Sequence, residues 1–216
     1  MIVARNNYTE FDTLKNGSTD TAEVEAYYDD WSARYDKELA DWDYTAPEVA
    51  AAMIAEHLQP GSQVLDLGCG TGQFAEKLLN RLDCHMDGVD ISEASLKHAE
   101  TRGCYASLRR IDLQQTPLPF ADNTFDGAAS VGVMTYIADP AALLANLCRI
   151  IRPSGPFVFT HRDDLWQEQG FDNMIAALTS HGLCEVLEIT DPKPYIPKHE
   201  DFTDRIEVKF ALLKTS

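Results

Sequence analysis

The stretch Val64–Gly72, with the sequence VLDLGCGTG, decides the fold. Its first half predicts a buried strand that carries Asp66 near its end, and its second half predicts a turn that opens a helix. Gly68, Gly70 and Gly72 remove side chains where the backbone must turn tightly and approach a ligand. Amide groups at the start of the next helix can then face an anionic group. Nucleotide-binding turns of several kinds look like this, but the spacing G-x-G-x-G departs from the G-x-G-x-x-G of dinucleotide folds.

The composition predicts one acidic domain. The chain has 216 residues, and 35 acidic against 18 basic side chains give a net charge of −17. This field repels polyanions, so we expect no nucleic-acid partner. Five cysteines without a C-x-x-C spacing are typical of free thiols in a reducing cytosol. Because the sequence contains neither a signal peptide nor a run of ~18 apolar residues, we expect a cytoplasmic protein without a membrane partner.

The order of elements along the chain indicates an α/β fold. Residues 1–19 are polar and predict a mobile tail, and Asp20 is a candidate N-cap for a helix that runs to about Leu39. A second helix is expected over residues 47–58. Short apolar strands then alternate with helices, which predicts a parallel sheet covered on both faces. The expected strands are 63–68, 85–90, 105–112, 124–131 and 156–161, and the expected helices between them are 72–82, 92–102 and 139–151.

The end of the chain breaks this alternation. A helix near residues 171–181 is followed by strands at 184–190 and 205–213. No helix is expected between these two strands, so they should pair antiparallel. We expect a single domain over residues 20–216.

Acidic residues and glycines recur where the predicted strands end, which is where doubly wound sheets bind ligands. Asp90 ends the second strand, 24 positions after Asp66, close to the ~20-residue offset at which an acid meets a ribose in related folds. Asp112 ends the third strand, ahead of the loop Gln114–Phe125, and the fourth strand ends in Ser130-Val131-Gly132-Val133. Together with the glycine loop, this ordered set resembles class I S-adenosylmethionine (SAM) methyltransferases.

That resemblance implies a fold and a cofactor site. The fold would be α/β, a three-layer doubly wound Rossmann-like sheet of seven strands with the last strand antiparallel and an N-terminal helical lid. The glycine loop would hold the methionine end of SAM, Asp90 the ribose hydroxyls, and Asp112 with the Leu113 amide the adenine. The cofactor residues implied in this part of the chain are Asp66, Gly68, Cys69, Gly70, Gly72, Asp90, Ile91, Asp112, Leu113, Ser130 and Val131.

The lid is suggested by an aromatic stripe at helical spacing, formed by Tyr27, Trp31 and Tyr35. Such stripes are usually core. The segment Tyr27–Asp36 also resembles the Y-D-x-W-A-x-x-Y-D segment of small-molecule methyltransferases, which implies that Trp31 and Tyr35 cover SAM. With the other motifs, the chain looks closest to the Williams–Beuren-region methyltransferase-like proteins. Residues 20–45 would then form the lid, 47–161 the cofactor half and 162–216 the acceptor side.

The acceptor side is harder to interpret. His161 follows the fifth strand and is a candidate general base, because imidazole titrates near neutrality; the alternative is a structural histidine. Arg162 could clamp an acceptor carboxylate, or Asp163 and Asp164 could neutralise it. No acidic and histidine cluster has metal-ligand spacing, so we expect no metal.

Three functions remain open at this point. The first is a SAM-dependent methyltransferase that moves a methyl group in line to a small-molecule acceptor, with S-adenosylhomocysteine as product. The second is an NAD(P)-dependent oxidoreductase on a similar sheet. The third is a member of the fold that binds SAM or a partner without turnover. The sequence leaves the acceptor and the oligomeric state open.

Overall fold

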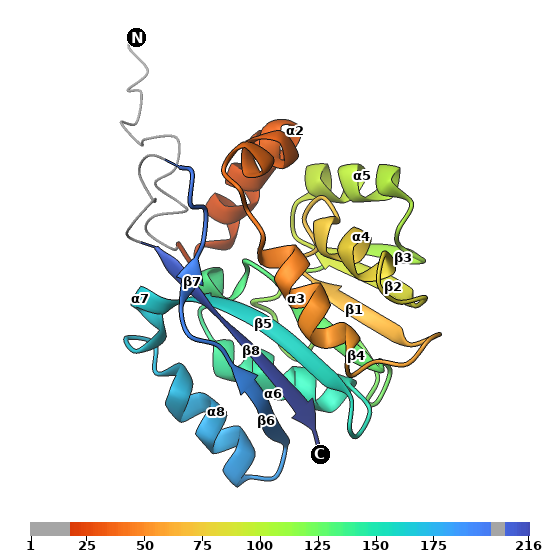
Figure 1. Ribbon diagram of the computed structural model, residues 1–216, viewed down its shortest axis with the longest axis vertical. Coiled ribbons are helices and arrows are strands. Elements are labelled where there is room, and N and C mark those ends of the chain that lie inside the picture. The colour runs from red at the N-terminus through yellow and green to blue at the C-terminus, as the bar shows by residue number, and fades with distance from the viewer. Residues whose placement is uncertain (1–17, 200–205) are drawn as a thin grey trace.

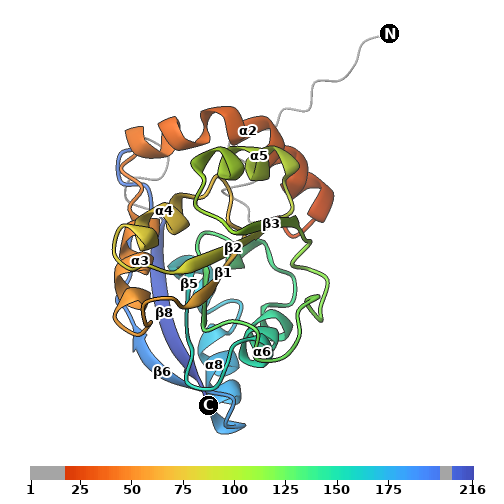
Figure 2. The same cartoon turned by 90° about the vertical axis from the view of Figure 1, so that its right-hand side faces the viewer.

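The computed structural model describes residues 18–199 and 206–216 (Figure 1). Most of the tail expected at residues 1–19 lies outside this range. The described chain forms one sheet with helices on both faces, and the helix α2 (Thr21–Asp41) runs along the top of the molecule above the sheet (Figure 2).

The sheet has the strand order β3-β2-β1-β4-β5-β8-β6, and a short strand, β7, pairs with β8. The pairs among the first five strands are parallel, whereas β8 runs antiparallel to its neighbours β5, β6 and β7. The expected doubly wound α/β fold with an antiparallel strand is confirmed. The strands are β1 (Gln63–Leu67), β2 (His85–Asp90), β3 (Ser107–Arg110), β4 (Gly127–Ser130), β5 (Pro156–Arg162), β6 (Cys184–Ile189), β7 (Lys193–Pro194) and β8 (Glu207–Thr215).

The helices lie in two layers. One face of the sheet carries α3 (Ala46–Ala55), α4 (Gln73–Leu79) and α5 (Glu93–Arg102), and the other carries α6 (Pro140–Ile150) and α8 (Phe171–Ser180) (Figure 1). The short helices η1 (Met134–Tyr136) and α7 (Asp163–Trp166) follow β4 and β5. No helix in the described ranges is both long and apolar enough to cross a membrane.

Two apolar cores form because side chains alternate across each strand. Leu65 and Phe159 pack toward α6 and α8, whereas Val64 and Val158 pack toward α3 and α4. Each large apolar side chain that is fully buried contributes about 1.5–3 kcal/mol. Asp66 lies on the same face as Val64 and is only 1% exposed, so a carboxyl group occupies a core position.

Local signals set the helix ends where the sequence predicted them. The side chain of Asp20 accepts from the Glu23 amide at the start of α2, and that of Ser92 accepts from the Ser95 amide at the start of α5. The third strand is shorter than expected, 107–110 instead of 105–112, because it forms the edge of the sheet and pairs only with β2.

Candidate active site

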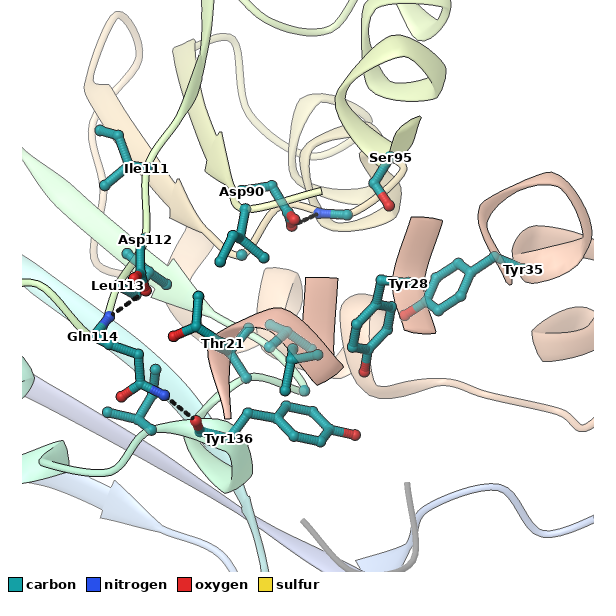
Figure 3. Close-up of a pocket in the computed structure, with 18 residues that line it drawn as sticks. Thr21, Tyr28, Tyr35, Asp90, Ser95, Ile111, Asp112, Leu113, Gln114 and Tyr136 are labelled. Atoms are coloured by element: carbon teal, nitrogen blue, oxygen red, sulfur yellow. Dashed lines mark hydrogen bonds between the residues drawn. The ribbon is translucent and has the colours of Figure 1, made fainter. Parts of the chain in front are cut away.

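The main candidate site is a cavity at the carboxyl ends of β1, β2 and β4, beneath α2 (Figure 3). It encloses about 720 Å³ with its mouth included. Eight of the residues expected at the cofactor line it, namely Tyr35, Gly68, Gly70, Asp90, Ile91, Asp112, Leu113 and Val131. The sheet therefore brings together residues that lie far apart in the sequence.

The glycine loop forms the floor of this cavity. Gly68 has φ 68°, and a Cβ atom there would lie 2.2 Å from Val133 Cγ2, so a side chain does not fit. No atom lies within 4 Å of the place that a Cβ of Gly70 would take, which leaves that side of the loop open to a ligand.

The amide groups of the glycine loop bind acceptors within the protein. The N–H groups of Gly68 and Cys69 donate to Val89 O, that of Gly70 donates to Asp90 Oδ2, and that of Gly72 donates to Cys69 O. The hydrogen-bonding capacity of these amides is therefore used within the protein, because the tight turn brings acceptors within reach. A ligand carboxylate would have to meet amides farther along, in the first turn of α4.

Asp90 sits at the end of β2 with its carboxylate fixed by backbone amides. It accepts from the Gly70 amide at 2.8 Å and from the Ser92 amide at 2.9 Å. Burial raises the pKa of Asp90, and these hydrogen bonds oppose that rise. The remaining lone pairs of a carboxylate held in this way can accept from two neighbouring hydroxyl groups.

The residues that come directly after β3 form another wall of the cavity. Asp112 accepts from the Gln114 amide at 2.9 Å and lies two residues beyond the strand rather than at its end. The side chain of Gln114, which sequence reasoning missed, donates to Tyr136 O at 2.7 Å (Figure 3). It also accepts from the Ala138 amide at 2.9 Å. Gln114 thereby ties this loop to η1 on the opposite wall.

A second, smaller cavity adjoins the first and shares Tyr35, Gly68, Gly70 and Val131 with it. Asp66 and Cys69 line this second cavity. Asp66 Oδ2 accepts from the Tyr105 hydroxyl at 2.7 Å. Burial raises the pKa of Asp66 to about 7, although the Tyr105 hydrogen bond opposes the rise.

The charge of the two cavities is one-sided. The described residues that line them include Asp66, Asp90 and Asp112 but no lysine, arginine or histidine. Buried carboxylates without a cation favour a positively charged ligand and disfavour an anionic one. The carboxyl edge of the sheet is therefore suited to a cationic ligand.

The lid helix α2 closes the cavities through polar contacts at two points. Asp29 accepts from Ser92 Oγ at 2.6 Å and from the Ala94 amide at 3.3 Å. Asp36 accepts from Thr71 Oγ1 and from Gln73 Nε2, and it forms an ion pair with Arg102. These contacts join α2 to the glycine loop and to α5.

Three of the expected cofactor residues line neither cavity. Trp31 is buried in the lid and packs edge-on against Tyr35, with ring centroids 4.6 Å apart. Gly72 is the N-cap of α4 with φ 92°. Ser130 is fully buried, and its hydroxyl has no hydrogen-bond partner within the described residues.

The acceptor side contains a third, narrow cavity, which shares the lining residues Gly132 and Tyr136 with the first. His161 lies beside it, but its ring stacks on Phe171 with centroids 4.2 Å apart. Burial, followed by the nearby Arg162 charge, lowers the pKa of His161 to about 4. Arg162 is held by Asp164, with Nε–Oδ1 at 3.0 Å and Nη2–Oδ2 at 2.6 Å. This pairing favours the alternative that Asp164 neutralises Arg162 over the one in which Arg162 clamps an acceptor carboxylate.

Four tyrosines besides Tyr35 lie around the three cavities. Tyr28, Tyr44, Tyr136 and Tyr195 come from four segments, and burial raises the pKa of each. Tyr28 belongs to the recognised aromatic segment, but no sequence pattern links the other three.

Comparisons with known proteins identify the family. A family model described as a methyltransferase domain matches residues 65–159. The chain is 30% identical over 179 residues to methyltransferase-like protein 27 of Homo sapiens, which covers 80% of this chain and 72% of that protein. It is 29% identical over 159 residues to O-methyltransferase rstn1 of Aspergillus nomiae, which covers 70% and 68%.

A solved structure agrees with the observed topology. The methyltransferase partner of the Haloferax volcanii Trm112 activator has a TM-score of 0.68 at 21% identity, over 89% of this chain and 97% of that one. The sheet order and the cavity at its carboxyl edge define a doubly wound α/β protein of the methyltransferase class. The chain belongs to the class I SAM-dependent methyltransferase family, and its activity is SAM-dependent methyl transfer.

The buried Asp66 leads to a stability prediction. An acid with a folded pKa of about 7 and an ordinary value of 3.8 retains its proton in the folded protein between those pH values. The stability it contributes is complete below the ordinary value and is lost as the pH rises through 7. Asp66→Asn should therefore raise the free energy of unfolding at pH 8 by about 1–3 kcal/mol, measured by urea denaturation at pH 5 and pH 8. Asp30→Asn, on the exposed face of α2, is the matched control; equal effects of both variants would contradict the assignment.

The lid contacts lead to a second prediction. Asp36→Ala removes three contacts of α2. Because these contacts lie near the surface, we expect the free energy of opening α2 to fall by about 1 kcal/mol in total. Hydrogen exchange in α2 should accelerate roughly fivefold. Lys37→Ala removes the exposed pair with Asp41 on the same helix and should leave exchange unchanged. Equal exchange in the two variants would show that Asp36 does not hold the lid.

Proposed function

We propose that this enzyme methylates a small-molecule acceptor and binds SAM across the first two cavities. The observation that carries this proposal is the set of carboxyl groups at the carboxyl edge of the sheet without a basic partner among the described lining residues. SAM carries a sulfonium and an ammonium group, and when bound it supplies an activated methyl group. Asp90 and Asp112 would accept from its hydroxyl and amino groups, while Asp66 would face its charged end.

The wall between the first and third cavities is the proposed meeting place of donor and acceptor. Gly132 belongs to both cavities, and its amide donates to Thr160 Oγ1 at 2.7 Å. A Cβ atom on Gly132 would lie 3.2 Å from the Tyr44 hydroxyl and 3.6 Å from the Tyr195 hydroxyl. The phenol groups of Tyr44 and Tyr195 therefore lie directly against the bare backbone of Gly132. In this arrangement the chain contributes alignment and exclusion of water.

The size of the acceptor side supports a small molecule. The third cavity is narrow, with about 280 Å³ of space including its open mouth, so only a small molecule or a single side chain could enter it. The similarity to O-methyltransferase rstn1 and the acidic surface, which disfavours nucleic acid, support the same reading. We expect no metal in the reaction, since the donor is already activated.

Asp90 provides the sharpest test of the cofactor position. Asp90→Ala should weaken SAM binding by ~1.5–3 kcal/mol, because charge-assisted hydrogen bonds are lost. Calorimetric titration with SAM, S-adenosylhomocysteine and NAD would measure this, and NAD should not bind because its pyrophosphate is anionic. Unchanged SAM affinity in a folded Asp90→Ala variant would show that the cofactor lies elsewhere.

The candidate base needs a separate test. His161→Phe retains a ring to stack on Phe171 but accepts no proton. If His161 is the base, turnover should fall at least 100-fold with unchanged SAM affinity. The buried ring with its lowered pKa instead supports a structural role, for which we expect turnover within about threefold of the wild type. His57→Gln, at an exposed position, is the control.

The class of acceptor is tested with [methyl-³H]SAM and a cell extract separated by size. Label in the low-molecular-weight fraction is expected. Label confined to protein would overturn the small-molecule proposal while leaving the methyltransferase activity intact.

A further inference from the structure

A tyrosine outside the recognised motifs reaches the acidic residue of the glycine loop. Tyr105 precedes β3, the edge strand, and its hydroxyl donates to Asp66 Oδ2 at 2.7 Å. On β2, the strand between them, Gly88 pairs in register with Asp66 and with Leu108 of β3. The ring of Tyr105 therefore extends past Gly88 to reach a carboxyl group two strands away.

Two glycines make room for this ring. A Cβ on Gly88 would lie 2.9 Å from Tyr105 Cε1, and a Cβ on Gly72 would lie 3.0 Å from Tyr105 Cε2. Real Cβ atoms are rarely that close to a ring, so both positions need glycine while Tyr105 is in place. Gly72 thus acquires a role that differs from its expected cofactor contact: it forms one side of the slot that holds Tyr105.

We propose that Tyr105 is a positioning residue of the SAM site, holding the Asp66 carboxylate ionised and fixed in orientation at the methionine end. The proposal rests on the placement of Asp66 in the cofactor site given under Proposed function. A hydroxyl that donates to a carboxylate stabilises the ionised form over the neutral acid. Among the described groups around Asp66 it is the donor that opposes the cost of burial.

The surroundings of Asp66 explain why one hydrogen bond matters. The ionisable groups that face it are Asp90 from β2, the Cys69 thiol from the glycine loop, and, across the second cavity, Tyr35 from α2 and Tyr44 ahead of α3. Thr71 of the glycine loop, Gln73 and Phe74 at the start of α4, and Pro47 of α3 also line this cavity and add no charge. None of these groups is a cation, and Asp90 repels a second negative charge. The ionised state of Asp66 consequently depends on Tyr105 and on a cationic ligand.

The sign of the resulting pH dependence follows. A cationic ligand binds the ionised carboxylate more tightly, so binding releases a proton wherever free Asp66 is protonated. Burial raises the pKa of Asp66 to about 7, so SAM affinity should fall as the pH drops below 7. Loss of the Tyr105 hydroxyl raises that pKa further, and the fall in affinity should begin at a higher pH.

The experiment is calorimetric titration with SAM from pH 6 to pH 8.5, in pairs of buffers with different ionisation heats. Tyr105→Phe keeps the ring in its slot and removes only the hydroxyl. At pH 7 its dissociation constant should be roughly three- to tenfold above that of the wild type, and the difference should shrink by pH 8.5. In an Asp66→Asn background, Tyr105→Phe should cause no further pH shift, because the pH dependence that remains belongs to other groups, among them Asp90 and the ammonium group of SAM, which titrates at about pH 8.

A measurement without ligand complements this. A ¹³C NMR titration of the Asp66 carboxyl should give a midpoint near neutrality in the wild type and a higher midpoint in Tyr105→Phe. Superimposable titrations of the wild type and a folded Tyr105→Phe variant, by NMR and by calorimetry, would overturn the role of Tyr105. SAM binding that is insensitive to Asp90→Ala would instead overturn the cofactor placement itself.

Discussion

Two carboxyl groups, Asp66 and Asp90, are buried side by side at the carboxyl edge of a parallel sheet, and the neighbouring structure is arranged around them. Such a pair is costly, because burial and mutual repulsion both disfavour ionisation. The protein offsets part of that cost with fixed donors: two backbone amides for Asp90 and the Tyr105 hydroxyl for Asp66. These donors leave the negative charge of the pair uncompensated, and a cationic ligand can balance it. The site is therefore less stable without a ligand than a neutral core would be, which is common where a site is built for binding.

The glycine loop serves this arrangement more than it serves a ligand directly. Its amides are used to hold the turn and Asp90, and its missing side chains leave space for Val133 at one position and for Tyr105 at another. The lid helix α2 is also held through carboxylates, because Asp29 and Asp36 accept hydrogen bonds from hydroxyl and amide groups and Asp36 pairs with Arg102. The strong negative charge of the chain is thus partly organised around the site rather than spread only over the surface.

The sequence predicted the parts of this structure that depend on local patterns. Strand β2 was predicted with its observed bounds, and the cap at Asp20 was predicted as well, because periodicity and capping act within a few residues. The short strand β7 and the helix η1 were missed, because they form through pairing and packing with distant segments. The same division applies to the site. Asp90 follows from its position at a strand end, whereas Gln114, Tyr44, Tyr105 and Tyr195 reach the site only through the folded topology.

His161 illustrates why residue type and strand end do not by themselves define a role. It lies at the predicted end of a strand, where a base could be placed, but β5 continues through Arg162 and pairs with β8 along its whole length. Alternation along that longer strand turns Thr160 toward Gly132 and His161 toward Phe171. The register of β5 against β8, rather than the identity of the histidine, determines which groups can take part in the chemistry.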